Sequence, residues 1–191
     1  MVDINICLTN IVLSSSIDTK LNLHDIAKNV INVIYKPKIF SGLILRHRKI
    51  RGTCLVFSNG KLITNGCSSM EEATRSTRQF ARFLQKYNNQ GELRHSIKIV
   101  TISALARTYG KLNLRKMVQY CGADYEPERF NAATLKKSGM HFSIFSSGNI
   151  VITGAKSVDQ IYEEGKECVD GFKSENTRNN VEETALASKG S

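Results

Sequence analysis

Histidine and cysteine, the residue types that most often perform catalysis or bind metals, are scattered along this chain. None of the four histidines stands in an HExxH, P-loop or GxGxxG context. The five cysteines are odd in number and form no CxxC pair, which argues against a zinc site and a disulfide framework. They are Cys7, Cys54, Cys67, Cys121 and Cys168. We therefore expect small core cysteines, no metal or cofactor, and a binding protein rather than an enzyme.

The charge of the chain favours a polyanionic partner. The 191 residues are 41% hydrophobic, enough to form a core, and carry a formal net charge of +10. The excess lies in residues 1–90, which hold 13 Lys and Arg against 5 Asp and Glu. No stretch approaches the roughly 20 apolar residues of a membrane span. The N-terminus does not resemble a secretory signal, so we expect a reducing intracellular setting.

An internal repeat organises the chain. Residues 20–23 (KLNL) recur at 111–114, residues 35–40 (YKPKIF) resemble 125–130 (YEPERF), and residues 58–66 (SNGKLITNG) resemble 146–154 (SSGNIVITG). Three matches in the same order predict duplication of one unit. We assign residues 1–90 to a first repeat with a linker at 87–95, and residues 91–172 to a second. The polar tail, residues 173–191, is expected to be disordered.

Each repeat is predicted to combine helices with antiparallel strands, an α+β plan. In the first repeat we expect strands at 4–12, 43–46, 53–57 and 61–65 and helices at 21–34 and 68–86. In the second we expect strands at 97–102, 141–145 and 149–153 and helices at 112–123 and 157–172. Asn59-Gly60 and Ser147-Gly148 suit tight hairpin turns. The central strand 54–57 is apolar on both faces, so helices should cover one side and a partner the other.

Three segments resemble the core of the TATA-binding protein family. They are Phe57-Ser-Asn-Gly-Lys61, Tyr125-Glu-Pro-Glu-Arg-Phe130, and Phe145-Ser-Ser-Gly148 followed by Thr153-Gly-Ala-Lys156. The similarity runs in the correct order from about residue 4 to residue 172. It implies a saddle of two pseudo-twofold repeats, with a curved antiparallel sheet and helices on the convex face.

The resemblance implies that the concave face binds the DNA minor groove and that two phenylalanines per repeat insert between base steps. That family is the reference example of such insertion. The inserted residues would be Phe40, Phe57, Phe130 and Phe145. For a single phenylalanine, packing in the core is the simpler interpretation, but four at equivalent positions beside turns favour insertion. The loop between the second pair is two residues shorter than its counterpart.

The resemblance also assigns residues to the floor of the groove, where small apolar residues and a few donors distinguish A·T from G·C pairs. In the first repeat these are Asn10, Val12, Leu55, Ile63 and Asn65. In the second they are Thr101, Ser103, Ile144 or Ser143, Val151 and Thr153. Thr101, Ser103 and Asn65 differ from the residues of the family, so an altered sequence preference is expected.

Positive residues are assigned to phosphates and to protein partners. By position, the phosphate contacts would be Lys38, Arg46, Lys61, Lys136 and Lys156. A stripe of Arg75, Arg78, Arg82 and Lys86 either keeps a helix soluble or binds a general factor resembling factor IIA. Glu126 and Glu128 match the family's contact to factor IIB, where Arg129 replaces a leucine.

We therefore expect a nuclear general transcription initiation factor that bends A/T-rich promoter DNA and recruits general factors and the RNA polymerase machinery to a preinitiation complex. The alternative is a scaffold of the same fold that acts mainly through protein contacts and binds DNA weakly. The retained phenylalanines favour the first hypothesis, whereas Thr101, Ser103 and Arg129 favour the second.

Overall fold

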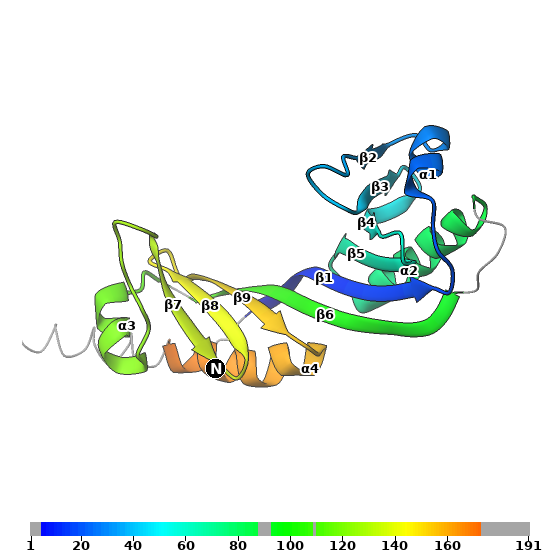
Figure 1. The fold of residues 1–191 in the computed structure, drawn as a ribbon. Helices are drawn as coiled ribbons and strands as arrows, with labels where there is room; N and C mark the ends of the chain where they lie inside the picture. The colour runs from blue at the N-terminus through cyan, green and yellow to red at the C-terminus, as the bar shows by residue number, and fades with distance from the viewer. Residues whose placement is uncertain (1–4, 88–92, 109, 173–191) are drawn as a thin grey trace, which may run out of the picture. The chain divides into compact units, whose positions relative to one another are not determined.

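The computed structural model describes residues 5–87, 93–108 and 110–172 (Figure 1). The chain divides into two compact units. Residues 9–102 form the first unit, and the residues before 9 together with those after 102 form the second. The strands β1 (Asn5–Ile17) and β6 (Leu93–Arg107) each contribute to both. The boundaries of these units therefore differ from the repeat boundaries expected at residues 90 and 91.

The first unit contains two helices and a set of antiparallel strands. Its helices are α1 (Leu23–Asn29) and α2 (Met70–Gln85). Its shorter strands are β2 (Val33–Tyr35), β3 (Leu43–His47), β4 (Ile50–Val56) and β5 (Lys61–Cys67). In the sheet, these strands lie in the order β2-β3-β4-β5-β1, and every pairing among them is antiparallel.

The second unit repeats this plan. It contains α3 (Leu114–Cys121) and the strands β7 (Ala132–Lys137), β8 (Met140–Phe145) and β9 (Asn149–Ala155). Its closing helix begins with α4 (Val158–Gln160), passes through one π-helical turn, η1 (Ile161–Gly165), and continues to residue 172. The strand order is β6-β9-β8-β7. In both units the long helix therefore follows the strand that pairs with β1 or β6.

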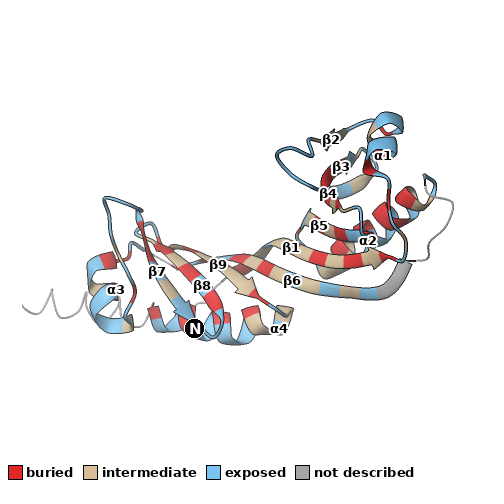
Figure 2. Ribbon diagram, viewed as in Figure 1, coloured by how far each residue is buried: buried red, intermediate tan, exposed pale blue. Residues whose placement is uncertain are grey.

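Alternating burial gives the sheet one core face and one open face in each unit. Along β4, Cys54 and Val56 are fully buried, while Leu55 between them is half-exposed. The same alternation can be followed along β1, β8 and β9 in Figure 2. In the first unit the buried side chains pack against Phe80, Ala81 and Leu84 of α2. Helices therefore cover the core face, and the described residues leave the half-exposed face uncovered.

Both hairpin turns form as the sequence predicts. Gly60 and Gly148 have φ angles of +83° and +86°, a region that favours glycine. The Gly60 N–H donates to Phe57 O at 3.0 Å and the Gly148 N–H to Phe145 O at 2.9 Å. The next bonds are also repeated, because Ile17 N–H donates to Gly60 O and Thr108 N–H to Gly148 O. The two turns are thus fixed in the same way.

The helix predicted at 21–34 is wrong in its extent. Asn22 Oδ1 accepts hydrogen bonds from the backbone N–H groups of His24 and Asp25, which starts α1 at Leu23. The helix ends at Asn29, Val30 is extended, and Asn32 has a φ of +66°. The β-branched residues that follow then pair with β3 as strand β2.

Other differences concern strand ends. β1 and β6 extend beyond the predicted 4–12 and 97–102, and strand β7 was not predicted at all. Of the predicted linker, residues 88–92 lie outside the described residues and Leu93 already belongs to β6. The predicted disordered tail, residues 173–191, also lies outside them. The expectation of core cysteines is wrong for Cys7, which is exposed.

Two further findings apply to the described part of the chain. None of its helices is long and apolar enough to cross a membrane. Within the same residues, no group of three or more His, Cys, Asp or Glu side chains is placed to hold a metal ion. None of the five cysteines forms a disulfide bond.

Candidate nucleic-acid interface

Two phenylalanines of the first unit form a partly exposed pair, with Phe40 at the end of a tight turn and Phe57 at the start of the hairpin turn. The backbone N–H of Phe40 donates to Lys36 O at 2.9 Å, which closes the turn that contains Pro37. The Phe40 and Phe57 rings lie edge to face, with centroids 5.8 Å apart and an interplanar angle of 74°. Phe40 keeps 37% of its surface exposed, so this ring is not part of the core.

The second unit builds the same pair from the same parts. Phe130 N–H donates to Glu126 O at 2.9 Å across the turn that contains Pro127. The Phe130 and Phe145 rings are 6.1 Å apart at 71°, and Phe130 is 46% exposed. The structure therefore brings each predicted pair together. The shorter loop of the second unit does not prevent this.

The open sheet face of the first unit carries an aliphatic row. Ile44 lies opposite Leu55, and Leu55 lies opposite Ile63, on three neighbouring strands. All three are half-exposed. We call them the first-unit row. Two of the predicted groove residues are in this row, and a third, Asn65, lies beside it opposite Thr53.

The equivalent row in the second unit is more polar. Thr134 lies opposite Ser143, and Ser143 opposite Val151. We call these residues the second-unit row. The prediction that Ile144 lines this face is wrong. Ile144 is fully buried because the alternation of β8 turns it toward the core, so Ser143 is the residue that the open face presents.

Asn10 has a defined side-chain position. Its Oδ1 accepts a hydrogen bond from the backbone N–H of Gly66 at 2.8 Å. This bond uses the oxygen of the amide, so Nδ2 is the group of Asn10 that can donate to an external acceptor. Its predicted counterpart Thr101 is half-exposed and offers a hydroxyl group instead. Val12, Ser103 and Thr153 are half-exposed as well.

The predicted phosphate-binding residues are all exposed. Lys136 of β7 lies opposite His141, which in turn lies opposite Thr153, so Lys136 is on the same sheet face as a predicted groove residue. Lys61 begins β5 directly after the hairpin turn. The cations are thus distributed around both units rather than gathered in one cluster.

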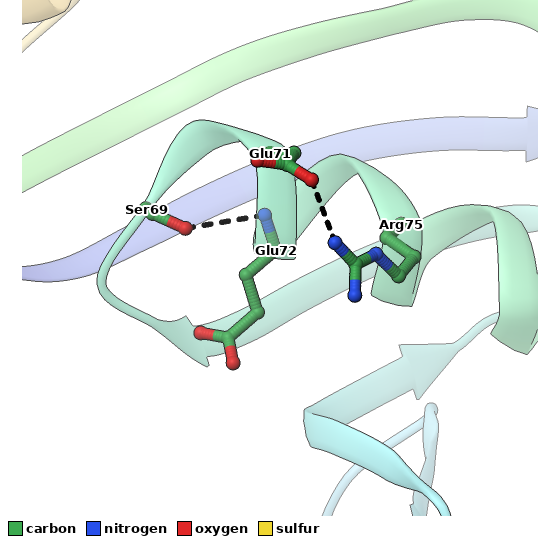
Figure 3. A network of polar contacts seen from close by, with 4 residues as sticks. All are labelled: Ser69, Glu71, Glu72 and Arg75. Atoms are coloured by element: carbon green, nitrogen blue, oxygen red, sulfur yellow. Dashed lines mark hydrogen bonds and ion pairs between the residues drawn. The ribbon is translucent and has the colours of Figure 1, made fainter.

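The predicted basic stripe lies along α2. Ser69 caps this helix by accepting a hydrogen bond from Glu72 N–H at 3.2 Å, and Arg75 pairs with Glu71 at 2.7 Å (Figure 3). Both partners of that pair are exposed, so the pair contributes little to stability. Its effect is to neutralise the N-terminal end of the stripe. Arg78, Arg82 and Lys86 are exposed further along.

The predicted factor-binding residues of the second unit lie in the turn before Phe130. Glu126, Glu128 and Arg129 are all exposed there. Arg129 Nη1 is 3.8 Å from Glu126 Oε2, a loose surface pair. The turn therefore presents both charges to solvent.

Two residues of the open face were missed by the sequence analysis. Ile44 stands in the continuous apolar run 43–45, where the sequence does not reveal which residue faces outward. Thr134 belongs to β7, which was not predicted. Strand pairing supplies the missing information. Ile44 lies opposite Leu55 and Thr134 lies opposite Ser143, so Ile44 and Thr134 occupy equivalent positions in the two units.

Comparisons with known proteins all point to one family. A family model described as transcription factor TFIID (or TATA-binding protein, TBP) matches residues 5–87 and 96–175. The chain is 33% identical to the TATA-box-binding protein-like 1 of Entamoeba histolytica, covering 80% of this chain and 72% of that protein. It is 34% identical to the TATA-box-binding protein of Sulfolobus acidocaldarius, covering 84% of this chain and 83% of the other. Of several longer relatives the chain covers between 46% and 52%.

A solved structure agrees with these matches. Methanococcus jannaschii TBP superposes with a TM-score of 0.76 at 28% identity, over 89% of this chain and 99% of that one. The predicted α+β fold class with two tandem repeats is thereby confirmed. The resemblance inferred from the sequence is confirmed as well, and the chain belongs to the TATA-binding protein family.

Proposed function

We propose that this DNA-binding transcription initiation factor binds the minor groove of A/T-rich promoter DNA and bends it by inserting two phenylalanine pairs. Family membership supports the general activity, and the family is not enzymatic. The recurring ring pairs support the mechanism. Phe40 with Phe57 and Phe130 with Phe145 are partly exposed aromatic pairs of nearly the same geometry.

The energy balance makes both the rings and the open face necessary. Burying one phenylalanine ring contributes about 1.5–3 kcal/mol. Smooth bending of the duplex costs about 1–6 kcal/mol, and unstacking costs a few more at each step. The rings therefore only offset the deformation. Net affinity has to come from packing of the first-unit and second-unit rows against the groove and from phosphate contacts.

Sequence preference would depend on small residues with few donors. A·T and T·A pairs present nearly the same acceptors in the minor groove, so an amide donor such as Asn10 Nδ2 accepts either orientation. Among the groove residues of the second repeat, Thr101 and Ser143 present hydroxyl groups on the open face. We expect a weaker discrimination against G·C pairs there than at Asn10.

Phosphate contacts would make binding depend on salt. If Lys38, Arg46, Lys61, Lys136 and Lys156 each neutralise one phosphate, the logarithm of affinity should fall with the logarithm of salt with a slope of about −4.5. Recruitment of general factors resembling IIA and IIB would use the α2 stripe and the turn at Glu126 and Glu128. In a eukaryotic cell this work belongs to the nucleus.

A protein scaffold with weak DNA binding is the second candidate, and the polar second-unit row favours it. The same experiment decides between the two. Gel retardation of a TATA duplex should weaken by at least about a hundredfold in the double variant Phe130→Ala with Phe145→Ala, because two buried rings are lost. Fluorescence transfer between the duplex ends should report a smaller bend.

Tyr162→Ala is the matched control. This tyrosine is as exposed as Phe130, at 46%, but lies on the closing helix. Its removal should leave retention and bend unchanged. If the double variant binds and bends DNA like the unmodified chain, insertion is excluded. If the unmodified chain itself does not retain the duplex, the scaffold is the better description.

A further inference from the structure

The long helices that close the two units are equivalent residue by residue. Ser69 caps α2 and Ser157 caps the closing helix of the second unit, each by accepting a hydrogen bond from the N–H three residues later. Ala73, Thr77, Phe80, Ala81 and Leu84 are buried on α2. Ile161, Gly165, Cys168, Val169 and Phe172 are buried 88 positions later. A constant separation allows the side chains at each position to be compared.

One aromatic position is compensated within the core. In the first unit Cys54 of β4 and Phe80 of α2 are both fully buried in one cluster. The equivalent residues in the second unit are Phe142 and Cys168, so the ring comes from the sheet and the thiol from the helix. Phe142 contacts Phe172 edge to face at 6.0 Å. The loss of a ring at Cys168 therefore leaves the core filled.

A second aromatic position is not compensated. Phe83 packs against the first-unit core, with its ring 5.0 Å from the His47 ring and 5.3 Å from the Tyr87 ring. Its equivalent is Gly171, which has no side chain. A Cβ built on Gly171 meets no atom within 4 Å. The second unit thus lacks the ring that the first unit places there, and the described residues leave an open space in its position.

A cavity of about 460 Å³ occupies this place. Its volume falls within the roughly 300–1,000 Å³ of ordinary ligand sites. Met117 of α3, Leu135 of β7 and Phe172 provide apolar walls, and Gly171 forms part of the boundary. All lining residues belong to the second unit. The apolar walls are therefore suited to an aromatic ring such as that of Phe83 in the first unit.

The charged residues that line the cavity carry a small positive excess, two lysines against one glutamate. Lys136 and Lys137 line it together with Glu167, and Lys137 stands where the first unit has His47. Burial raises the pKa of the Cys168 thiol; the charge of Lys137 lowers it, and the charges of Glu167 and Glu164 raise it further, so Lys137 and both glutamates act on the thiol. If an aromatic ring of a ligand entered the cavity, a negative charge next to that ring in the ligand would lie near Lys137.

We propose that this cavity is a docking site for an aromatic side chain of a partner protein, carried in an acidic segment. The first unit shows that a phenylalanine ring on a polypeptide fits between a helix and a sheet edge of this design. The lysines favour acidic neighbours for the ring. The chain's own residues 173–191 contain no aromatic residue, so they cannot supply it.

Fluorescence anisotropy with the full chain tests the site. The probes are a short labelled peptide with one phenylalanine between aspartates and the same peptide with alanine in its place. The phenylalanine peptide should bind at least about tenfold more tightly, because only it buries a ring. Gly171→Phe should abolish that difference by filling the cavity, whereas Gly171→Ala should keep it.

The outcomes separate this site from DNA binding. Gly171→Phe should leave retention of the TATA duplex unchanged and should raise the melting temperature, since it restores the packing of the first unit. Equal binding of both peptides, or an undiminished difference in Gly171→Phe, would overturn the proposal. So would a gain of more than about tenfold in affinity on deletion of residues 174–191, because the tail would then be the occupant. Lys137→Gln should reduce affinity for the acidic peptide and its dependence on salt.

Discussion

The cores of the two units use the same frame but distribute aromatic volume differently. In the first unit the ring of Phe80 comes from the helix and the small residue, Cys54, from the sheet. In the second unit Phe142 of the sheet supplies the ring and Cys168 of the helix the thiol. Caps and turns are repeated almost bond for bond. Duplicated units can therefore exchange residues in the core as compensating pairs while the backbone plan is kept.

The open faces of the units differ without such compensation. The first-unit row is aliphatic, whereas Thr134 and Ser143 make the second-unit row polar. Side chains on an uncovered face are not closely packed against other residues. A substitution there therefore does not require a compensating substitution elsewhere. This freedom is expected where the partner, rather than the core, selects the residue. We therefore expect the differences on the open faces to affect binding and those in the core to affect stability.

The largest expected effect is in the exchanged core pair. Phe80→Cys alone should lower the free energy of unfolding by about 3–5 kcal/mol, because it leaves a cavity in the first unit. Cys54→Phe alone should cost about 1–3 kcal/mol through overpacking. The double variant reproduces the arrangement of the second unit. It should recover about 0.5–3 kcal/mol relative to the sum of the two single changes. Urea unfolding of the four proteins measures this coupling.

The reciprocal pair is the matched control. Phe142→Cys with Cys168→Phe gives the second unit the arrangement of the first, and the same favourable coupling is expected. Strictly additive costs in both units would contradict the exchange, and would mean that the surroundings of each ring have diverged further than the two residues.

The next effect in this order is expected from the buried thiols at high pH. Burial raises the pKa of the Cys54 thiol to about 12, against an ordinary value of 9.0. Above pH 9 the unfolded chain releases this proton and the folded chain keeps it. The free energy of unfolding should therefore fall between pH 9 and pH 12, by up to about 1.4 kcal/mol per pH unit for this group.

Urea unfolding at several pH values checks this against Cys54→Ala, which should show a flatter decline. Cys168→Ala should flatten the curve less. The Cys168 thiol also has a raised pKa, but it lines a cavity and lies near Lys137. Parallel curves for the unmodified chain and Cys54→Ala would show that the Cys54 pKa is ordinary.

The repeat made most of the fold predictable from the sequence. Gly60 and Gly148, Pro37 and Pro127, and the four phenylalanines occur in pairs, and a pair at a fixed separation indicates a turn or a site more strongly than either residue alone. Polar helix caps such as Ser69 limited the position of α2 to within two residues. The elements, the ring pairs and most of the open face followed from these signals.

The errors have a common physical cause, which is that strand pairing is a long-range contact. The run 132–137 contains two alanines and two lysines, which have little intrinsic strand preference, and β7 exists because it pairs with β8. The choice between Ser143 and Ile144 depends on which face of β8 the core occupies. The cavity beside Gly171 was likewise hidden, since it depends on volumes contributed by two helices and a strand.

A change of one row residue should alter DNA affinity by about tenfold. Leu55→Ser gives the first-unit row the residue that Ser143 provides in the second, and it removes about 1.5 kcal/mol of apolar burial in the complex. Ser143→Leu should strengthen binding by a similar factor and leave its salt dependence unchanged, because it adds apolar contact without changing the number of neutralised phosphates. Gel retardation at two salt concentrations measures both variants. Identical affinities would mean that the open faces do not contact DNA.

The smallest expected effect concerns the support beneath the ring pairs. A Cβ on Gly42 would lie 2.7 Å from Cε1 of Phe40 and 3.1 Å from Cε1 of Phe57, whereas the second unit has Ala132 at the equivalent position, opposite Phe145. Gly42→Ala should therefore shift the Phe40 ring toward the 6.1 Å spacing of the second pair without unfolding the turn. DNA retention should weaken by less than about tenfold. That result would mean that the wider spacing of the Phe130–Phe145 pair also supports DNA binding. A loss of DNA affinity as large as that caused by removing both rings would show instead that the close Phe40–Phe57 contact is required.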